Sequence, residues 1–179
     1  MPTRKLDAIA MLKEDHRKVE ELFEQFEKAK GDDRKKKLAE EICMELIIHT
    51  MIEEEIFYPA LRGKIEGDTL DEAYVEHDGA KLLVAELLQG DPSADFFDAK
   101  VTVLSEEIKH HVKEEERPSS GMFAQARAAD VDLAGLGERL KERKQMLKAE
   151  FQSKGLPTPV TRSLSGASLE FGQPVAAMA

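Results

Sequence analysis

The stretch HTMIEEEIFYP at residues 49–59 decides the fold. It begins with a histidine, His49, that is followed four residues later by Glu53, and the same spacing recurs at His111 and Glu115. Residues four apart lie on the same face of an α-helix, so each pair can present two donor groups in one direction. Since imidazole and carboxylate together suit iron, manganese or zinc, each pair could chelate a metal ion.

Apolar residues around these two pairs recur in alternating steps of three and four, which is the pattern of a helix face that packs into a core. Two further segments show the same pattern, and one histidine interrupts each of the four faces. The predicted helices cover residues 7–30, 34–61, 69–89 and 93–117. The polar residues on their inward faces are His16, His49, Glu53, His77, His111 and Glu115. The apolar positions on the same faces are Ile9, Leu12, Val19, Phe23 and Phe26; Leu38, Ile42, Leu46 and Ile56; Leu70, Ala73, Ala80, Val84 and Leu87; and Phe97, Val101, Leu104 and Ile108.

Turn-forming and capping residues separate the predicted helices. Thr69, with Glu72 three residues later, is a capping box that starts the third helix. The Asp-Pro-Ser segment at residues 91–93 starts the fourth helix, and Pro59 is expected to kink or end the second one. Because the connections are short, neighbouring helices are expected to be antiparallel. The sequence therefore predicts an all-α, antiparallel four-helix bundle in up-down-up-down order.

The six inward polar side chains need partners, because an unpaired buried carboxylate costs several kcal/mol. Counting residues from the helix ends, at about 1.5 Å per residue, places all six near one level of the bundle. A shared metal site would satisfy them together. His110 is a less certain ligand. It lies four residues before Glu114 but one step off the apolar face, so the pattern favours His111 and Glu115.

The order and spacing of these residues resemble the hemerythrin-like HHE cation-binding domain over about residues 5–117. The matching segments are LKEDH at residues 12–16, HTMIEEEIFYP at 49–59, EHD at 76–78 and HHVKEEE at 110–116. The resemblance implies a non-haem di-iron centre, with the four inward histidines as terminal ligands and the two inward glutamates as bridges. Zinc and manganese stay as alternatives to iron. Some members of the family place the carboxylate five residues after its histidine, which would pair His110 with Glu115.

One position departs from the oxygen-carrying hemerythrins, which have two histidines four apart on the third helix. Here Ala73 stands four residues before His77. This leaves room for water, a substrate or another side chain, and Tyr58, Tyr74 and Glu20 are candidates to line the gap. An open site favours reaction with, or sensing of, dioxygen, peroxide or nitric oxide over reversible oxygen carriage.

The expected function is therefore that of a di-iron protein that reacts with or senses a small oxidant or gas. The alternative is a metal- or oxygen-responsive regulatory bundle that binds a partner without catalytic turnover. A third hypothesis is a bundle whose inward polar residues fix the helix register without a metal. Whether the chain is an enzyme stays open at this point.

The composition changes after Pro118. Residues 118–131 hold few charges, Asp132 can cap a further helix, and the last segment holds three of the seven prolines. The predicted parts are a bundle domain at residues 1–117, a linker at 118–131, an accessory helix at 132–155 and an extended or disordered tail at 156–179. A homodimer or a protein partner would bind through residues 132–179.

The overall composition limits the other classes of function. Net charge is −10 over 179 residues, which disfavours nucleic acid as a partner. Cys43 is the single cysteine, so neither an internal disulfide nor a cysteine-based zinc site can form. The sequence holds no long uncharged apolar run and its first residues form no apolar leader. It therefore predicts no membrane partner and a cytoplasmic location.

Overall fold

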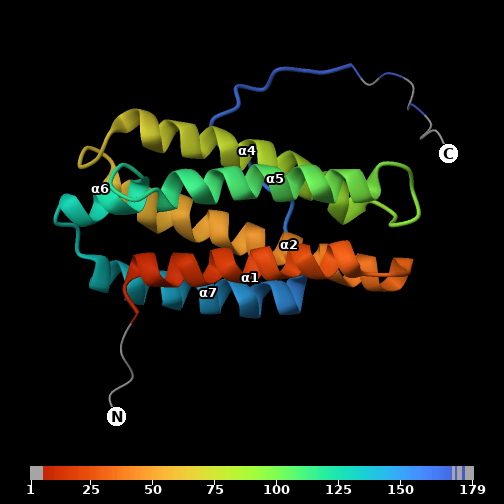
Figure 1. Cartoon of the computed structure of the whole chain (residues 1–179), viewed down its shortest axis with the longest axis horizontal. Helices are drawn as coiled ribbons and strands as arrows, with labels where there is room; N and C mark the ends of the chain where they lie inside the picture. Colours follow the sequence, from red (N-terminus) through yellow and green to blue (C-terminus); the bar gives the residue numbers. More distant parts are fainter. Residues whose placement is uncertain (1–5, 171, 173–174, 176–179) are drawn as a thin grey trace, which may run out of the picture.

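The computed structural model describes residues 6–170, 172 and 175, and every regular element in them is helical. The bundle consists of α1 (Ala8–Lys28), α2 (Asp32–Ile52), α4 (Gly67–Gln89) and α5 (Phe97–Glu116). Contacts join α1 to α2, α2 to α4, α4 to α5 and α5 to α1, so the four helices close a ring around one core. Figure 1 shows these helices running lengthwise along the long axis of the molecule. The predicted all-α four-helix bundle is confirmed.

The end of the second helix explains one difference in the core. Every predicted inward apolar residue is buried except Ile56, which is partly buried. A π-helical turn, η1 (Glu53–Phe57), follows α2 and leads into α3 (Tyr58–Leu61). The Tyr58 N–H donates to the carbonyl of Glu53 five residues earlier, and the wide turn precedes Pro59, whose ring would clash with the backbone of an ordinary α-turn. The extra residue turns Tyr58 inward in place of Ile56.

Two helices begin away from their predicted first residues. The α4 helix begins at Gly67 rather than Thr69, and the Thr69 hydroxyl accepts a 3.3 Å hydrogen bond from Gln125 instead of capping the helix. The α5 helix begins at Phe97 because the side chain of Asp91 accepts hydrogen bonds from the Ser93 N–H and hydroxyl, at 2.9 and 2.8 Å. These bonds close a separate turn ahead of the helix.

The region after α5 is more structured than a plain linker. A short helix, α6 (Met122–Ala128), lies inside residues 118–131, and it precedes α7 (Leu133–Lys154). Asp132 caps α7 as predicted, accepting a 2.9 Å hydrogen bond from the Gly135 N–H. The α7 helix packs on α1, α2 and η1 outside the ring. A Cβ at Gly137 would lie 2.7 Å from the Leu6 carbonyl, so glycine permits this close approach.

The chain after α7 forms no helix or strand in its described residues and runs back across α2 and α4 (Figure 1). Residues 157–164 are called the tail strap below. The Lys81 ammonium donates to the Val160 carbonyl at 3.0 Å, and Asp78 accepts the Ser163 N–H at 2.6 Å. This part of the predicted tail is therefore extended and attached to α4.

None of the helices in the described part of the chain is both long enough and apolar enough to cross a membrane.

Candidate metal centre

The six side chains predicted to bind metal lie together inside the bundle, and each is at most 5% exposed. Their donor atoms form two overlapping groups. One consists of His16, His49, Glu53 and Glu115, and the other of Glu53, His77 and His111. Within each group all donor atoms lie within 4.8 Å of one another. Metal–ligand bonds of about 2.0–2.2 Å separate the donors around one ion by up to about 4 Å, so each group is close to the size of a metal site.

The two glutamates link the groups. Oε2 of Glu53 lies 3.1 Å from Nε2 of His49 and 3.3 Å from Nε2 of His77. The Glu115 carboxylate lies between the other two histidines, with Oε2 3.3 Å from Nε2 of His16 and Oε1 3.6 Å from Nε2 of His111. Each carboxylate thus faces one histidine on either side, which is the arrangement of a group that bridges two ions.

The outer nitrogen of each histidine faces a second carboxylate. The Nδ1 contacts are His16 with Glu116 at 2.7 Å, His49 with Asp15 at 3.8 Å, His77 with Glu54 at 3.0 Å, and His111 with Glu76 at 2.7 Å. Each carboxylate comes from the helix before its histidine in the ring, so the contacts run once around the bundle. Metal-binding histidines commonly donate their other N–H to a carboxylate, which orients the ring and raises its basicity.

These four outer carboxylates are absent from the sequence prediction, although the sequence contains a signal for them. Each is the direct chain neighbour of a predicted ligand: Asp15 of His16, Glu54 of Glu53, Glu76 of His77 and Glu116 of Glu115. One residue along a helix is a rotation of about 100°. A neighbour of an inward residue therefore faces the adjacent helix, where the next histidine lies.

The unsatisfied atoms at the centre fit a bound cation. If Nδ1 donates to the outer carboxylate, Nε2 keeps its lone pair and points inward. Nε2 of His77 and Nε2 of His111 lie 3.2 Å apart, and both then offer a lone pair to a shared ion. The buried atoms without a hydrogen-bond partner in the described residues include Nε2 of His16, Nε2 of His49, Oε1 of Glu53 and Oε2 of Glu115. A metal ion would satisfy all of these atoms together.

Without a metal, the raised pKa values of His16, His49 and His77 favour protonated rings that offset the charge of the carboxylates. Burial opposes a charge on His49, but Glu53 and Asp15 outweigh burial and raise the pKa of His49 to about 10. Burial also opposes a charge on His16 and His77, but nearby glutamates outweigh it and raise both pKa values. These glutamates are Glu115 and Glu116 for His16, and Glu53 and Glu54 for His77. Burial raises the pKa of Glu53, but His49 and His77 outweigh it and hold that pKa well below its usual value.

Of the three residues expected to line the gap, Tyr58 reaches the centre. Its hydroxyl lies 2.9 Å from Oε1 of Glu115, 3.2 Å from Oε2 of Glu53 and 3.2 Å from Nε2 of His77. Burial, followed by the charges of the two glutamates, raises the pKa of Tyr58 well above its usual value. The other two residues stay outside: Tyr74 packs on the Tyr58 ring, and Glu20 pairs with Arg17.

The less certain ligand, His110, lies outside the cluster. Its side chain is 62% exposed, and its Nε2 atom lies 3.3 Å from Oε1 of Glu76. The structure thus places His111, and not His110, beside Glu115.

A cavity of about 200 Å³ adjoins the cluster where Ala73 leaves space. Its lining includes the buried His111 and Glu115 and extends to the exposed Glu72 and Ser120. Most of the lining groups are polar, and several are carboxylates. The cavity therefore extends from exposed residues at the surface to two of the predicted ligands.

The short helix α6 covers another side of the cluster. Phe123 stacks on the His16 ring, with centroids 5.8 Å apart and an angle of 9° between the planes, and also contacts Phe57. The sequence prediction assigned this segment to a linker. Gly121 makes the fold-back possible, because a Cβ there would lie 2.6 Å from the Glu115 carbonyl.

Comparisons with known proteins agree with this geometry. The sequence model of the hemerythrin HHE cation binding domain matches residues 7–118. A protein described as a DNA nickase from Nostoc sp. is 32% identical over 118 residues, and the match covers 65% of this chain and 32% of that protein. The chain thus spans about a third of the length of that relative.

Among solved structures, the fold is similar to a crystal structure of a hemerythrin HHE cation binding domain-containing protein from Mycobacterium kansasii. The TM-score is 0.70 at 24% sequence identity, and the match covers 84% of this chain and 95% of the other. The family match covers most of this chain, and the buried histidines and glutamates fit a metal. The chain belongs to the hemerythrin HHE cation-binding domain family.

Proposed function

We propose that the chain binds two iron ions between its helices and reacts with a small oxidant. His16 and His49 would hold one ion, His77 and His111 the other, and Glu53 and Glu115 would bridge them. The observation that carries this proposal is the pair of donor groups that share Glu53. Oxygen and imidazole donors of this kind suit iron.

Tyr58 is the proposed additional ligand of the second ion. The group of Glu53, His77 and His111 holds three donors, and the Tyr58 hydroxyl lies 3.2 Å from both Nε2 of His77 and Oε2 of Glu53. A nearby cation reverses the effect of the carboxylates on the phenol, because it favours the ionised form.

The access cavity supports hydrogen peroxide as the oxidant. Its lining carboxylates, Glu72 and Glu76 among them, outnumber its one arginine, Arg117, and so disfavour anions such as superoxide and nitrite. Its polar surface can hydrogen-bond a neutral peroxide molecule and favours it over apolar dioxygen or nitric oxide. When bound, iron would supply the exchange of electrons with peroxide, while the chain's own residues admit the molecule and keep the centre enclosed.

This proposal does not extend to the activity in the name of the Nostoc relative. The match covers 32% of that protein, so most of its length has no counterpart here.

The test is peroxide consumption by iron-loaded protein, compared between the natural chain and an Ala73→Leu variant. A leucine side chain would fill part of the cavity beside His111. The variant should keep its iron and consume peroxide about tenfold more slowly, which corresponds to about 1.4 kcal/mol of barrier. Iron-loaded natural protein that consumes no peroxide would refute this function.

A further inference from the structure

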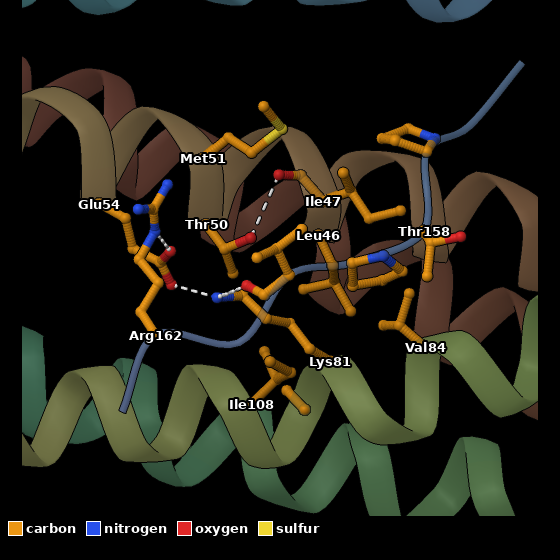
Figure 2. Close-up of a pocket in the computed structure, with 14 residues that line it drawn as sticks. Leu46, Ile47, Thr50, Met51, Glu54, Lys81, Val84, Ile108, Thr158 and Arg162 are labelled. Atoms are coloured by element: carbon orange, nitrogen blue, oxygen red, sulfur yellow. Dashed lines mark hydrogen bonds and ion pairs between the residues drawn. The ribbon is translucent and has the colours of Figure 1, made fainter. Parts of the chain in front are cut away.

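The tail strap, residues 157–164, contacts the metal cluster through one intermediate residue. Nε of Arg162 donates to Oε2 of Glu54 at 2.8 Å (Figure 2). Oε1 of the same carboxylate lies 3.0 Å from Nδ1 of His77. A residue 44 positions beyond the end of the family match at residue 118 thus reaches the outer nitrogen of a predicted ligand through a single carboxylate.

Hydrogen bonds between the strap and Asp78 on α4 fix the position of Arg162. Asp78 accepts the N–H groups of Arg162, Ser163 and Leu164 at 2.8, 2.6 and 3.2 Å, and the Ser163 hydroxyl at 2.7 Å. Burial raises the pKa of Asp78, but the bonds from Ser163 and Arg162 outweigh it and lower that pKa to about 2. The carboxylate therefore stays charged and keeps the strap attached at neutral pH.

Packing alone does not explain this attachment. An apolar cavity of about 140 Å³ lies between the strap and the helices beneath it, lined by residues that include Leu46, Ile47, Val84 and Ile108 (Figure 2). A fully packed segment would leave no such space. The polar bonds of the strap, and not close apolar contact, therefore fix its position.

The cluster receives a similar contact from α7. Lys144 donates to Asp15, the carboxylate that faces Nδ1 of His49. In each donor group, one histidine thus faces a carboxylate that pairs with a cation from the C-terminal region. Asp15, which faces His49, pairs with Lys144, and Glu54, which faces His77, pairs with Arg162. The bundle itself supplies Lys81, which donates to Glu54 at 2.7 Å.

We propose that Arg162 is a positioning residue for the metal ligand His77, and that it acts through Glu54. This inference rests on the proposed function, because it assigns Arg162 a role toward the metal. Arg162 holds the Glu54 carboxylate in place, and its positive charge, together with that of Lys81, stabilises the ionised carboxylate. A less basic Glu54 accepts a weaker hydrogen bond from the His77 N–H, so the His77 ring is less basic and donates less electron density to the ion.

The test compares Arg162→Gln, Arg162→Lys and Ser163→Ala in the full chain. Loss of the Arg162 charge should leave Glu54 more basic, which favours ferric over ferrous iron and lowers the midpoint potential. Arg162→Lys should restore the natural value because it keeps the charge. Ser163→Ala removes the hydroxyl bond to Asp78 but keeps the three bonds from the backbone N–H groups of residues 162–164, so Arg162 keeps its place beside Glu54. This variant is the matched control and should not shift the potential.

A second readout needs no metal. Nitrogen-15 NMR of the metal-free protein should show shifted imidazole resonances of His77 in Arg162→Gln, with unchanged resonances in Ser163→Ala. Equal effects of the two variants, or none from Arg162→Gln, would overturn the role of Arg162. If the natural chain binds no iron, the proposed function fails. The NMR comparison then still decides whether Arg162 positions His77.

Discussion

Nδ1 of His111 lies 2.7 Å from Oε2 of Glu76, and the two residues come from adjacent helices, α5 and α4. A similar contact recurs at His16 and His77, at 2.7 and 3.0 Å, whereas Nδ1 of His49 lies 3.8 Å from Asp15, beyond hydrogen-bond distance. The three short contacts hold the Nε2 atoms of their histidines toward the centre. The cluster is therefore organised before any ion binds, and its outer carboxylates should contribute to metal affinity.

A Glu76→Gln variant tests that contribution. Glutamine keeps the shape of the side chain but removes the charge beside His111, so metal affinity should fall by about tenfold, the lower end of the effect of such partners. Competition with a chelator measures the change. Glu86→Gln, on the same helix but paired with Lys100 on the surface, is the control. Equal losses in both variants would argue against a role for Glu76.

The neighbouring residues His110 and His111 offer a matched pair of substitutions. His111→Ala should remove a ligand and lower the bound metal, while His110→Ala should leave it unchanged because that side chain is largely exposed. Metal analysis of both purified variants, with circular dichroism as a check on folding, gives the answer. A greater loss of bound metal in His110→Ala than in His111→Ala would show that His110, and not His111, is the ligand.

Tyr58→Phe keeps the buried ring and removes the hydroxyl near His77, Glu53 and Glu115. If Tyr58 binds iron as a phenolate, the iron-loaded natural protein should show a visible charge-transfer band that the variant lacks. The fold should persist, because the change deletes a single oxygen atom. An identical spectrum in the variant would exclude Tyr58 as a ligand.

Metal affinity should rise with pH. The metal-free protein keeps a proton on His49 up to a pKa of about 10, and the pKa values of His16 and His77 are also raised. A metal must displace these protons, so acidification strengthens the competitor, and each displaced proton changes the affinity by up to about tenfold per pH unit. Calorimetry in buffers of different ionisation enthalpy would measure the release. Binding without proton release would contradict this account of the metal-free site.

The inward face of each helix was predictable because the apolar period identifies it. Positions such as Leu12, Val84 and Leu104 are buried as expected, and the six polar residues on the same faces converge. The prediction holds only in part at Ile56, which packs against the core but is only partly buried, because periodicity assumes a regular α-helix and a π-turn adds one residue to the count. Tyr58 could thus be placed among the candidates, but its inward direction could not be derived.

The contacts that cross between helices were beyond the sequence pattern. The pairing of Glu54 with Arg162 joins residues 108 positions apart, and no local period connects them. The sequence pattern did not predict the short helix around Phe123, because its seven residues are too few to show a clear apolar period. It is stabilised by packing against His16 and Phe57, which becomes visible only when the bundle is assembled.

The most direct test of the central claim is the number of iron ions bound per chain. Purified protein would be reconstituted with ferrous iron without oxygen, freed of loosely bound metal, and analysed by mass spectrometry for metal and by protein assay. The two groups that share Glu53 predict about two irons per chain. A chain that binds no iron, or saturates at one, would contradict the di-iron centre.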